Sequence, residues 1–161
     1  MSKKFSISRV FILFSLLLFP IQPIHADEIT GLSTGQTIYV PAYSHIYIGN
    51  KERPFLLTVT LSIRNVDPKH QIKIIRADYY ETQGTLLKKY IDKPILLKSL
   101  ESFRFVIPQK DKSGGSGANF IVEWRSDKFV NPPIVESIMI GTQSSQGISF
   151  TSRGQEIYLS E

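Results

Sequence analysis

The segment "LTVTLSIR", residues 57–64, decides the fold class of this sequence. Every second residue is a large aliphatic one, and the residues between them are hydroxyl-bearing or charged. Successive side chains of a β-strand point to opposite faces, so this alternation predicts a half-buried strand. The aliphatic face consists of Leu57, Val59, Leu61 and Ile63. No helical stripe of comparable length stands out in the remainder of the chain.

Similar short segments, separated by turn residues, fill the rest of the sequence. Gly84 is expected at a tight hairpin turn, where it can adopt a positive φ, and Trp124 is expected to anchor the core. This pattern predicts an all-β, antiparallel, immunoglobulin-like β-sandwich of about seven to nine short strands. The expected strand segments are 71–80, 85–91, a piece within 92–102, 103–108, 119–125, 134–141 and one or two near 146–159.

The first 26 residues have the pattern of a signal peptide. Three basic residues precede an apolar run of about ten residues (10–19), and Ala26 offers a small residue for cleavage. The apolar run is too short to span a membrane, for which about 20 residues are needed. We therefore expect a signal peptide at 1–26, a lead-in at 27–35, a single domain at 36–161, and export to the periplasm or outside the cell. A retained signal anchor is the alternative.

The amino-acid composition excludes several kinds of binding site and partner. The absence of cysteine excludes disulfides and thiolate metal sites. Removing Lys3, Lys4 and Arg9 with the signal leaves 16 basic against 14 acidic residues, a net charge of +2. This charge is too small to indicate a nucleic-acid partner. His45 and His70 are the histidines left after cleavage, and their spacing matches no metal site, so no metal or cofactor is expected.

The stretch "DKSGGSGANF", residues 111–120, is the first candidate site. Glycine-rich turns can present backbone N–H groups to an anion. However, Lys112 precedes the glycines instead of following them, and a strand pattern replaces the helix that a phosphate loop requires. We interpret the stretch as a mobile connector between strands, with a small anion or phosphate-bearing ligand as the alternative. The residues that would bind this ligand are Asp111, Lys112, Ser113, Gly114, Gly115, Ser116, Gly117 and Asn119.

A row of ring side chains in "YVPAYSHIY", residues 39–47, is the second candidate. If the segment stays extended, these side chains share one face and offer hydroxyl and imidazole groups to a protein or sugar. An edge strand, in which Pro41 is tolerated, is the structural alternative. The row consists of Tyr39, Tyr43, His45 and Tyr47.

Two further features carry charge. Residues 88–112 contain seven basic and three acidic residues, which indicates either a surface for phosphate-bearing polymers and lipid headgroups or a solvated strand face. Arg153, among glycines and hydroxyl residues near the C-terminus, could bind an anion or lie where the sandwich closes. A hydrolase triad of Ser116, His45 and Asp67 can be assembled on paper, but no spacing supports it.

Several separated motifs carry a resemblance to known families. Residues 63–91 and 96–108 resemble the immunoglobulin-like modules of late-embryogenesis and related bacterial secreted proteins. The motifs "YSHIY", "LSIRNVDP", "DKSGGSGANF" and "GISFTSRG" resemble domain-of-unknown-function family 3124, a family of uncharacterised bacterial exported proteins. The resemblance covers residues 36–154. It implies a fold and a location, and it brings no activity.

The sequence therefore predicts an exported, non-enzymatic β-sandwich module that binds or braces an envelope protein or polymer. Two alternatives remain open at this point. One is an anion-binding protein that uses the glycine-rich loop, and the other is a hydrolase with an unrecognised site.

Overall fold

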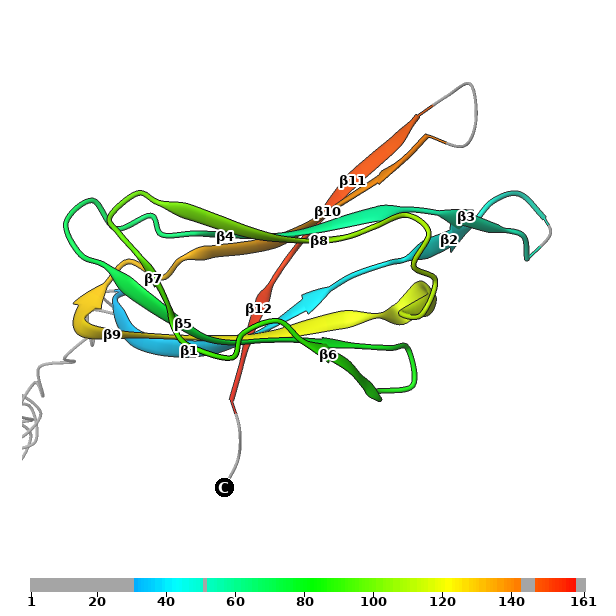
Figure 1. Ribbon diagram of the computed structural model, residues 1–161. Helices are drawn as coiled ribbons and strands as arrows, with labels where there is room; N and C mark the ends of the chain where they lie inside the picture. The colour runs from blue at the N-terminus through cyan, green and yellow to red at the C-terminus, as the bar shows by residue number, and fades with distance from the viewer. Residues whose placement is uncertain (1–30, 51, 143–146, 159–161) are drawn as a thin grey trace, which may run out of the picture. The chain divides into compact units, whose positions relative to one another are not determined.

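Two β-sheets packed face to face form the body of the protein (Figure 1). The structure, a computed structural model, describes residues 31–50, 52–142 and 147–158. Within these residues the chain forms twelve strands and one short 3₁₀ helix, η1. They are β1 (Ser33–Pro41), β2 (His45–Tyr47), β3 (Pro54–Leu56), β4 (Thr58–Arg64), β5 (Ile72–Tyr80), β6 (Leu86–Lys89), β7 (Ile95–Leu97), β8 (Ser102–Ile107), η1 (Gly115–Gly117), β9 (Asn119–Val130), β10 (Ile134–Gly141), β11 (Ile148–Arg153) and β12 (Gln155–Ile157).

The larger sheet has the strand order β12-β1-β9-β5-β6, and β7 also pairs with β5. All of its pairings are antiparallel. Its longest strand, β9, has 12 residues and pairs with β1 on one side and with β5 on the other. At about 3.3 Å per residue, β9 spans roughly 35–40 Å and connects the two ends of the sandwich.

The smaller sheet has the order β11-β10-β4-β8 and is also antiparallel. The segment that decided the fold class lies at its centre, because β4 pairs with both β10 and β8. The alternating aliphatic residues of β4 and the residue before it are fully buried. The side chain of Ser137 on β10 donates a hydrogen bond to the carbonyl oxygen of Pro41 on β1, which links the two sheets.

The core fills the space between the sheets, and Trp124 is completely buried within it. Its indole N–H donates to the Gln36 side chain at 3.3 Å, and Gln36 in turn donates to Glu156 at 2.9 Å. The indole N–H of the largest core side chain is therefore satisfied by Gln36 on β1, which Glu156 on β12 holds in place. Both the antiparallel sandwich and the role of Trp124 are as expected.

The strand count is higher than expected because several connections form short strands that pair over three residues each. Residues 39–47, expected as one extended segment, divide into β1 and β2 at residues 42–44. β1 begins at Ser33, so residues 33–35 of the expected lead-in are part of the sandwich. β1 is not an edge strand over Thr37–Tyr39, where β9 and β12 flank it. The expected signal peptide lies outside the described residues.

Candidate functional site

The glycine-rich loop connects β8 to β9, as expected, but it is docked on the protein surface by hydrogen bonds. The backbone N–H and the hydroxyl of Thr82 both donate to the carbonyl oxygen of Gly114 at 3.0 Å. The N–H of Gly117 donates to the Thr82 hydroxyl at 3.0 Å. The N–H and hydroxyl of Ser44 donate to the carbonyl oxygen of Gly115 at 3.0 and 3.1 Å. The turn before β6 and the segment before β2 therefore hold the loop in place.

Internal contacts also occupy the amide groups that an anion would need. The N–H of Ser113 donates to the Asp111 carboxylate, and the N–H of Gly115 donates to the carbonyl oxygen of Lys112. With Gly117 bound to Thr82, three N–H groups of the loop already have partners inside the protein. Every second amide from Ser113 to Gly117 is therefore not free to bind an anion. Asn119, the last predicted site residue of the loop, pairs with Pro41 as the first residue of β9.

Close packing explains why the loop contains glycine. A β-carbon at position 114 would overlap the Tyr79 hydroxyl, and one at position 115 would overlap the Thr82 hydroxyl. Gly115 also has φ of +78°, a conformation that residues with side chains rarely adopt. The glycines thus allow the loop to approach β5 and the Thr82 turn closely.

The predicted row of ring side chains is split between separate structural elements. Tyr39 lies on the outer face of the larger sheet, whereas Tyr43 packs edge-on against Phe150 with ring centroids 5.7 Å apart. His45 and Tyr47 lie together on β2, with centroids 5.3 Å apart and a 3.4 Å contact between Nε2 and the hydroxyl. The chain leaves the sheet after Pro41, and this departure breaks the row.

Arg153 lies where the chain passes from the smaller to the larger sheet. It ends β11, and the next residue, Gly154, donates its N–H to the carbonyl oxygen of Val135 at 2.8 Å. A β-carbon on Gly154 would lie 2.6 Å from Ile38. Arg153 also lines a cavity of about 280 Å³ together with Gln36 and Glu156. The geometry favours closure of the sandwich over an anion site.

The hydrolase triad written from the sequence does not assemble. Ser116 is in η1, before the first residue of β9, and His45 is near it through the docking of Ser44. Asp67 instead contacts Asn131, directly after the last residue of β9. The length of β9 separates the carboxylate from the other two residues. The triad of Ser116, His45 and Asp67 is therefore wrong.

A first candidate surface runs along the side of the sandwich where β6, β7 and β8 end the sheets; we call it the open edge. β8 ends the smaller sheet and pairs with β4 alone among the described strands. Tyr90 bridges the two sheets there, with its ring 4.9 Å from that of Phe105, and Lys88 lies 4.5 Å above the Tyr90 ring. Large exposed apolar side chains of the open edge are Leu86, Leu87, Leu96, Phe103 and Val106.

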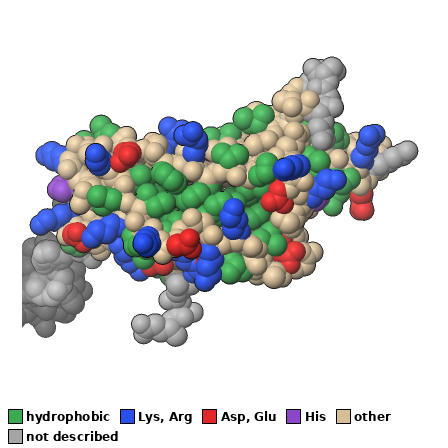
Figure 2. All heavy atoms as spheres, in the orientation of Figure 1, with side chains coloured by type: hydrophobic (Ala, Val, Ile, Leu, Met, Phe, Trp, Pro, Cys, Tyr) green, Lys and Arg blue, Asp and Glu red, His purple; other side chains and the backbone are tan. Residues whose placement is uncertain are grey.

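Figure 2 shows apolar side chains gathered along the middle of one face, with Lys and Arg around them. Five of the seven basic residues of segment 88–112 lie on β6, on β8 or in the loop that follows β8: Lys88, Lys89, Arg104, Lys110 and Lys112. Most of the charge bias of this segment therefore belongs to the strands that form the open edge and to the loop after them.

A buried polar cluster organises the opposite end of the sandwich from the glycine-rich loop. The Asp67 carboxylate accepts hydrogen bonds from the backbone N–H groups of Lys69, His70 and Asn131 at 2.8–3.0 Å, and also from the Asn131 side chain. The Asn65 amide donates to the carbonyl oxygens of His70 and Lys98 at 2.8 Å. The cluster therefore fixes three chain segments relative to one another.

These hydrogen bonds keep Asp67 ionised. The Asn131 N–H, followed by that of Lys69, holds the pKa of the Asp67 carboxyl well below its usual range, and burial opposes this only in part. The imidazole Nδ1 of His70 lies 3.2 Å from the Asp67 carboxylate. Because a carboxylate can only accept, this contact places the proton on Nδ1 and leaves Nε2 for other partners.

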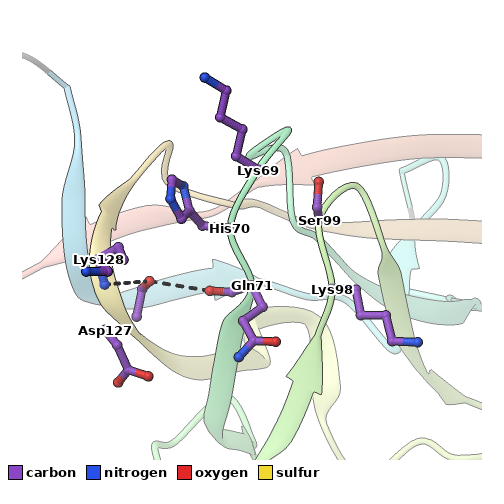
Figure 3. A pocket seen from close by; sticks show the side chains of 8 residues that line it. Lys69, His70, Gln71, Lys98, Ser99, Asp127 and Lys128 are labelled. Carbon is purple, nitrogen blue, oxygen red and sulfur yellow. Dashed lines mark hydrogen bonds between the residues drawn. The ribbon is translucent and has the colours of Figure 1, made fainter.

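A pocket of about 350 Å³ opens beside this cluster (Figure 3). Its walls come from the β4–β5 loop, the β7–β8 turn and the end of β9. The Ser126 hydroxyl donates to the carbonyl oxygen of Gln71 at 3.3 Å and ties two of these walls together. In Figure 3 the side chains of Lys69, Lys98 and Lys128 extend from three different segments around the pocket. The pocket is therefore basic, polar and built on a fixed frame.

The described residues hold neither a cluster of metal ligands nor a helix able to cross a membrane. No three histidine, cysteine or acidic side chains among them lie together as metal ligands would. None of the helices in this part of the chain has the length and apolar character needed to cross a membrane.

The protein is therefore an antiparallel β-sandwich module. It has two candidate binding surfaces, the open edge and the basic pocket at the end of the sandwich. The chain belongs to the family described as "Protein of unknown function (DUF3124)", whose model matches residues 35–157. This match extends the resemblance expected from residues 36–154 by a few residues.

Other comparisons add little. No curated protein matches the chain. A solved structure titled "Crystal Structure of Thermotoga maritima 1070" is similar at 13% identity with a TM-score of 0.43. The match covers 74% of this chain and 92% of that chain.

Proposed function

We propose that this protein is an exported, non-enzymatic module that binds another protein of the cell envelope through its open edge. The observation that carries the proposal is the exposure of β8. This six-residue strand ends its sheet, pairs on one side only among the described residues, and has Val106 49% exposed. A free strand edge with apolar side chains is a template for a partner strand.

Natural proteins usually protect such edges with charged residues, prolines or bulges. β8 contains a single charge, Arg104, and no proline within its bounds, and its register with β4 is regular over all six pairs. Lys88 and Lys89 on β6 add positive charge next to it. These features suit a partner strand that carries apolar residues and acidic ones.

The part of the proposal that concerns export is supported by the signal-peptide pattern at residues 1–26. Family membership is compatible with it and assigns no activity. The alternatives based on the glycine-rich loop and on a hydrolase triad are not carried forward, because the loop amides have internal partners and the triad residues lie far apart.

The experiment is in-cell crosslinking of the full chain, followed by identification of co-purified envelope proteins. Val106→Lys places a charge on the outer side of β8, and we expect it to reduce recovery of the partner at least tenfold. The matched control is Thr151→Lys on β11, an exposed residue on the opposite edge of the same sheet. Equal recovery from both variants would overturn the proposal. Recovery of the same partner with β8 residues in the crosslinks would support it.

A further inference from the structure

Two large apolar side chains project into solvent at the end of the sandwich that carries the basic pocket. Leu100 is 67% exposed and Phe129 is 70% exposed. Leu100 also has φ of +60°, a left-handed conformation that is costly for a leucine. Strain and exposure together argue that this side chain does not serve the stability of the fold.

Both residues directly follow, in the chain, residues that line the basic pocket. Leu100 follows Lys98 and Ser99, which line one wall, and Phe129 follows Lys128, which lines another. The third wall contributes Lys69 and His70. We call the surface formed by Lys69, Lys98, Lys128, Leu100 and Phe129 the end surface.

The charge of the end surface is not neutralised by the protein. Lys69, Lys98 and Lys128 have no carboxylate within 4 Å among the described residues, whereas Asp127, the one acidic residue that lines the pocket, is 3.1 Å from Lys73. Figure 2 shows Lys and Arg side chains gathered at this end of the molecule. An anionic partner would therefore meet three available ammonium groups around a polar hollow.

The backbone that displays these residues is held rigidly. Asp67 fixes the β4–β5 loop to Asn131 after β9, and the Ser99 hydroxyl donates to the carbonyl oxygen of Asp67 at 2.9 Å. Asn65 binds the carbonyl oxygen of Lys98. All three walls are thus tied to one buried cluster, so binding would require little ordering of the loops.

We propose that the end surface docks on a membrane that contains anionic phospholipid. Lipid phosphates meet the three lysines, whose side chains extend outward from separate segments around the pocket, and Leu100 and Phe129 enter the boundary between headgroups and acyl chains. Apolar side chains flanked by lysines are the composition that binds membrane interfaces, and each lysine near an anionic leaflet contributes separately. The inference goes beyond the proposed function, because the end surface and the free edge of β8 consist of different residues.

The test is co-sedimentation of the full chain with vesicles. Vesicles of phosphatidylcholine mixed with phosphatidylglycerol should bind the protein, and this binding should weaken as salt is raised. Vesicles of phosphatidylcholine alone should not bind it. A parallel titration with inorganic phosphate, followed by NMR, distinguishes a lipid headgroup from a free anion. Saturable phosphate binding without vesicle binding would overturn the membrane proposal.

Two sets of variants locate the surface. Changing Lys69, Lys98 and Lys128 together to Gln should weaken vesicle binding about a hundredfold, since each lysine near an anionic surface contributes about fivefold. The control changes Lys88, Lys89 and Lys110 to Gln, which removes the same charge elsewhere. Equal losses in both variants would overturn the proposal, because they would indicate a general effect of net charge.

Leu100→Gly tests the apolar contact without risk of unfolding. Glycine adopts the left-handed conformation freely, so the variant should be at least as stable as the parent protein and yet bind vesicles more weakly. Unchanged vesicle binding by Leu100→Gly combined with Phe129→Ser would show that no apolar insertion occurs.

Discussion

The Tyr79 hydroxyl lies directly against Gly114, where any side chain on residue 114 would overlap it. Tyr79 is only 2% exposed and belongs to β5, while Gly114 belongs to the loop before η1. This contact joins the glycine-rich loop to the core of the sandwich. Because the ring of Tyr79 is also 4.9 Å from that of Phe120, it cannot move aside without disturbing the core.

Gly114→Ala should therefore destabilise the protein by about 1–3 kcal/mol, the usual cost of overpacking. Urea denaturation measures the change in the free energy of unfolding. The control is Gly147→Ala, where a β-carbon would make only an ordinary contact of 3.8 Å. Equal stability of both variants would contradict the close packing of the loop.

Tyr79→Phe should have the opposite effect and stabilise the protein by about 1 kcal/mol. The Tyr79 hydroxyl is buried and has no hydrogen-bond partner among the described residues, so its removal eliminates a desolvation cost. Burial also raises the pKa of Tyr79 to about 12, and the Ser44 hydroxyl beside it lowers this pKa only in part, because that hydroxyl donates its hydrogen to the Gly115 carbonyl oxygen at 3.1 Å instead. Ultraviolet titration of parent and variant should assign the highest tyrosine pKa to this residue. A destabilised Tyr79→Phe protein would show that the hydroxyl is satisfied.

Asp67 should make the stability of the protein depend on acid pH. Its folded-state pKa is lowered by the N–H groups of Asn131, Lys69 and His70, so the unfolded chain takes up the proton first, near pH 4. The stabilisation is complete above the unfolded pKa and is lost progressively as the pH falls below it. Denaturation curves between pH 7 and pH 2 measure this loss.

The control for this prediction compares the removal of two carboxylates, Asp67 and Asp127, which lie at the same end of the sandwich. Asp67→Asn should be less stable than the parent at pH 7 and should show a smaller loss of stability on acidification. Asp127→Asn removes an exposed ion pair with Lys73, and such pairs contribute little. If both variants showed the same pH dependence, the hydrogen-bonded cluster around Asp67 would not be its source.

Leu100→Gly should raise the free energy of unfolding by about 1 kcal/mol, because glycine has no steric cost at a φ of +60°. Leu100→Ala is the matched variant, since alanine removes the apolar side chain and keeps the strain. The difference between the two variants in urea denaturation therefore measures the strain itself. A Leu100→Gly protein no more stable than Leu100→Ala would remove the conformational argument for the end surface.

The sequence predicted those parts of the fold that depend on local pattern. The alternation in residues 57–64, the hairpin at Gly84 with its φ of +86° and the burial of Trp124 all follow from residues near one another in the chain. The docking of the glycine-rich loop on the protein surface could not be predicted from its sequence. Its composition indicates mobility, whereas its hydrogen bonds come from Thr82 and Ser44, which are distant in sequence.

The candidate surfaces were predictable only in part. The excess of basic residues in 88–112 can be read from the sequence. The position of β8 at the end of a sheet cannot, because it depends on pairing with the distant strand β4. From the sequence, Asp67 enters only as the third member of the hydrolase triad. The sequence does contain one signal: three side chains able to bind backbone groups, Asn65, Asp67 and His70, fall within one short connection. Their partners Lys98 and Asn131 could not be read from spacing.

The pairing of β1 with β12 determines how the domain would respond to mechanical force. Thr37 lies opposite Ile157, and Tyr39 lies opposite Gln155, so the strands near the two ends of the described domain run antiparallel side by side. Tension applied between residues 33 and 157 would peel β12 from β1 one pair at a time instead of shearing all pairs together. Pulled in this direction, the sandwich should yield first at this ladder of three pairs, while the long strand β9 stays held between β1 and β5.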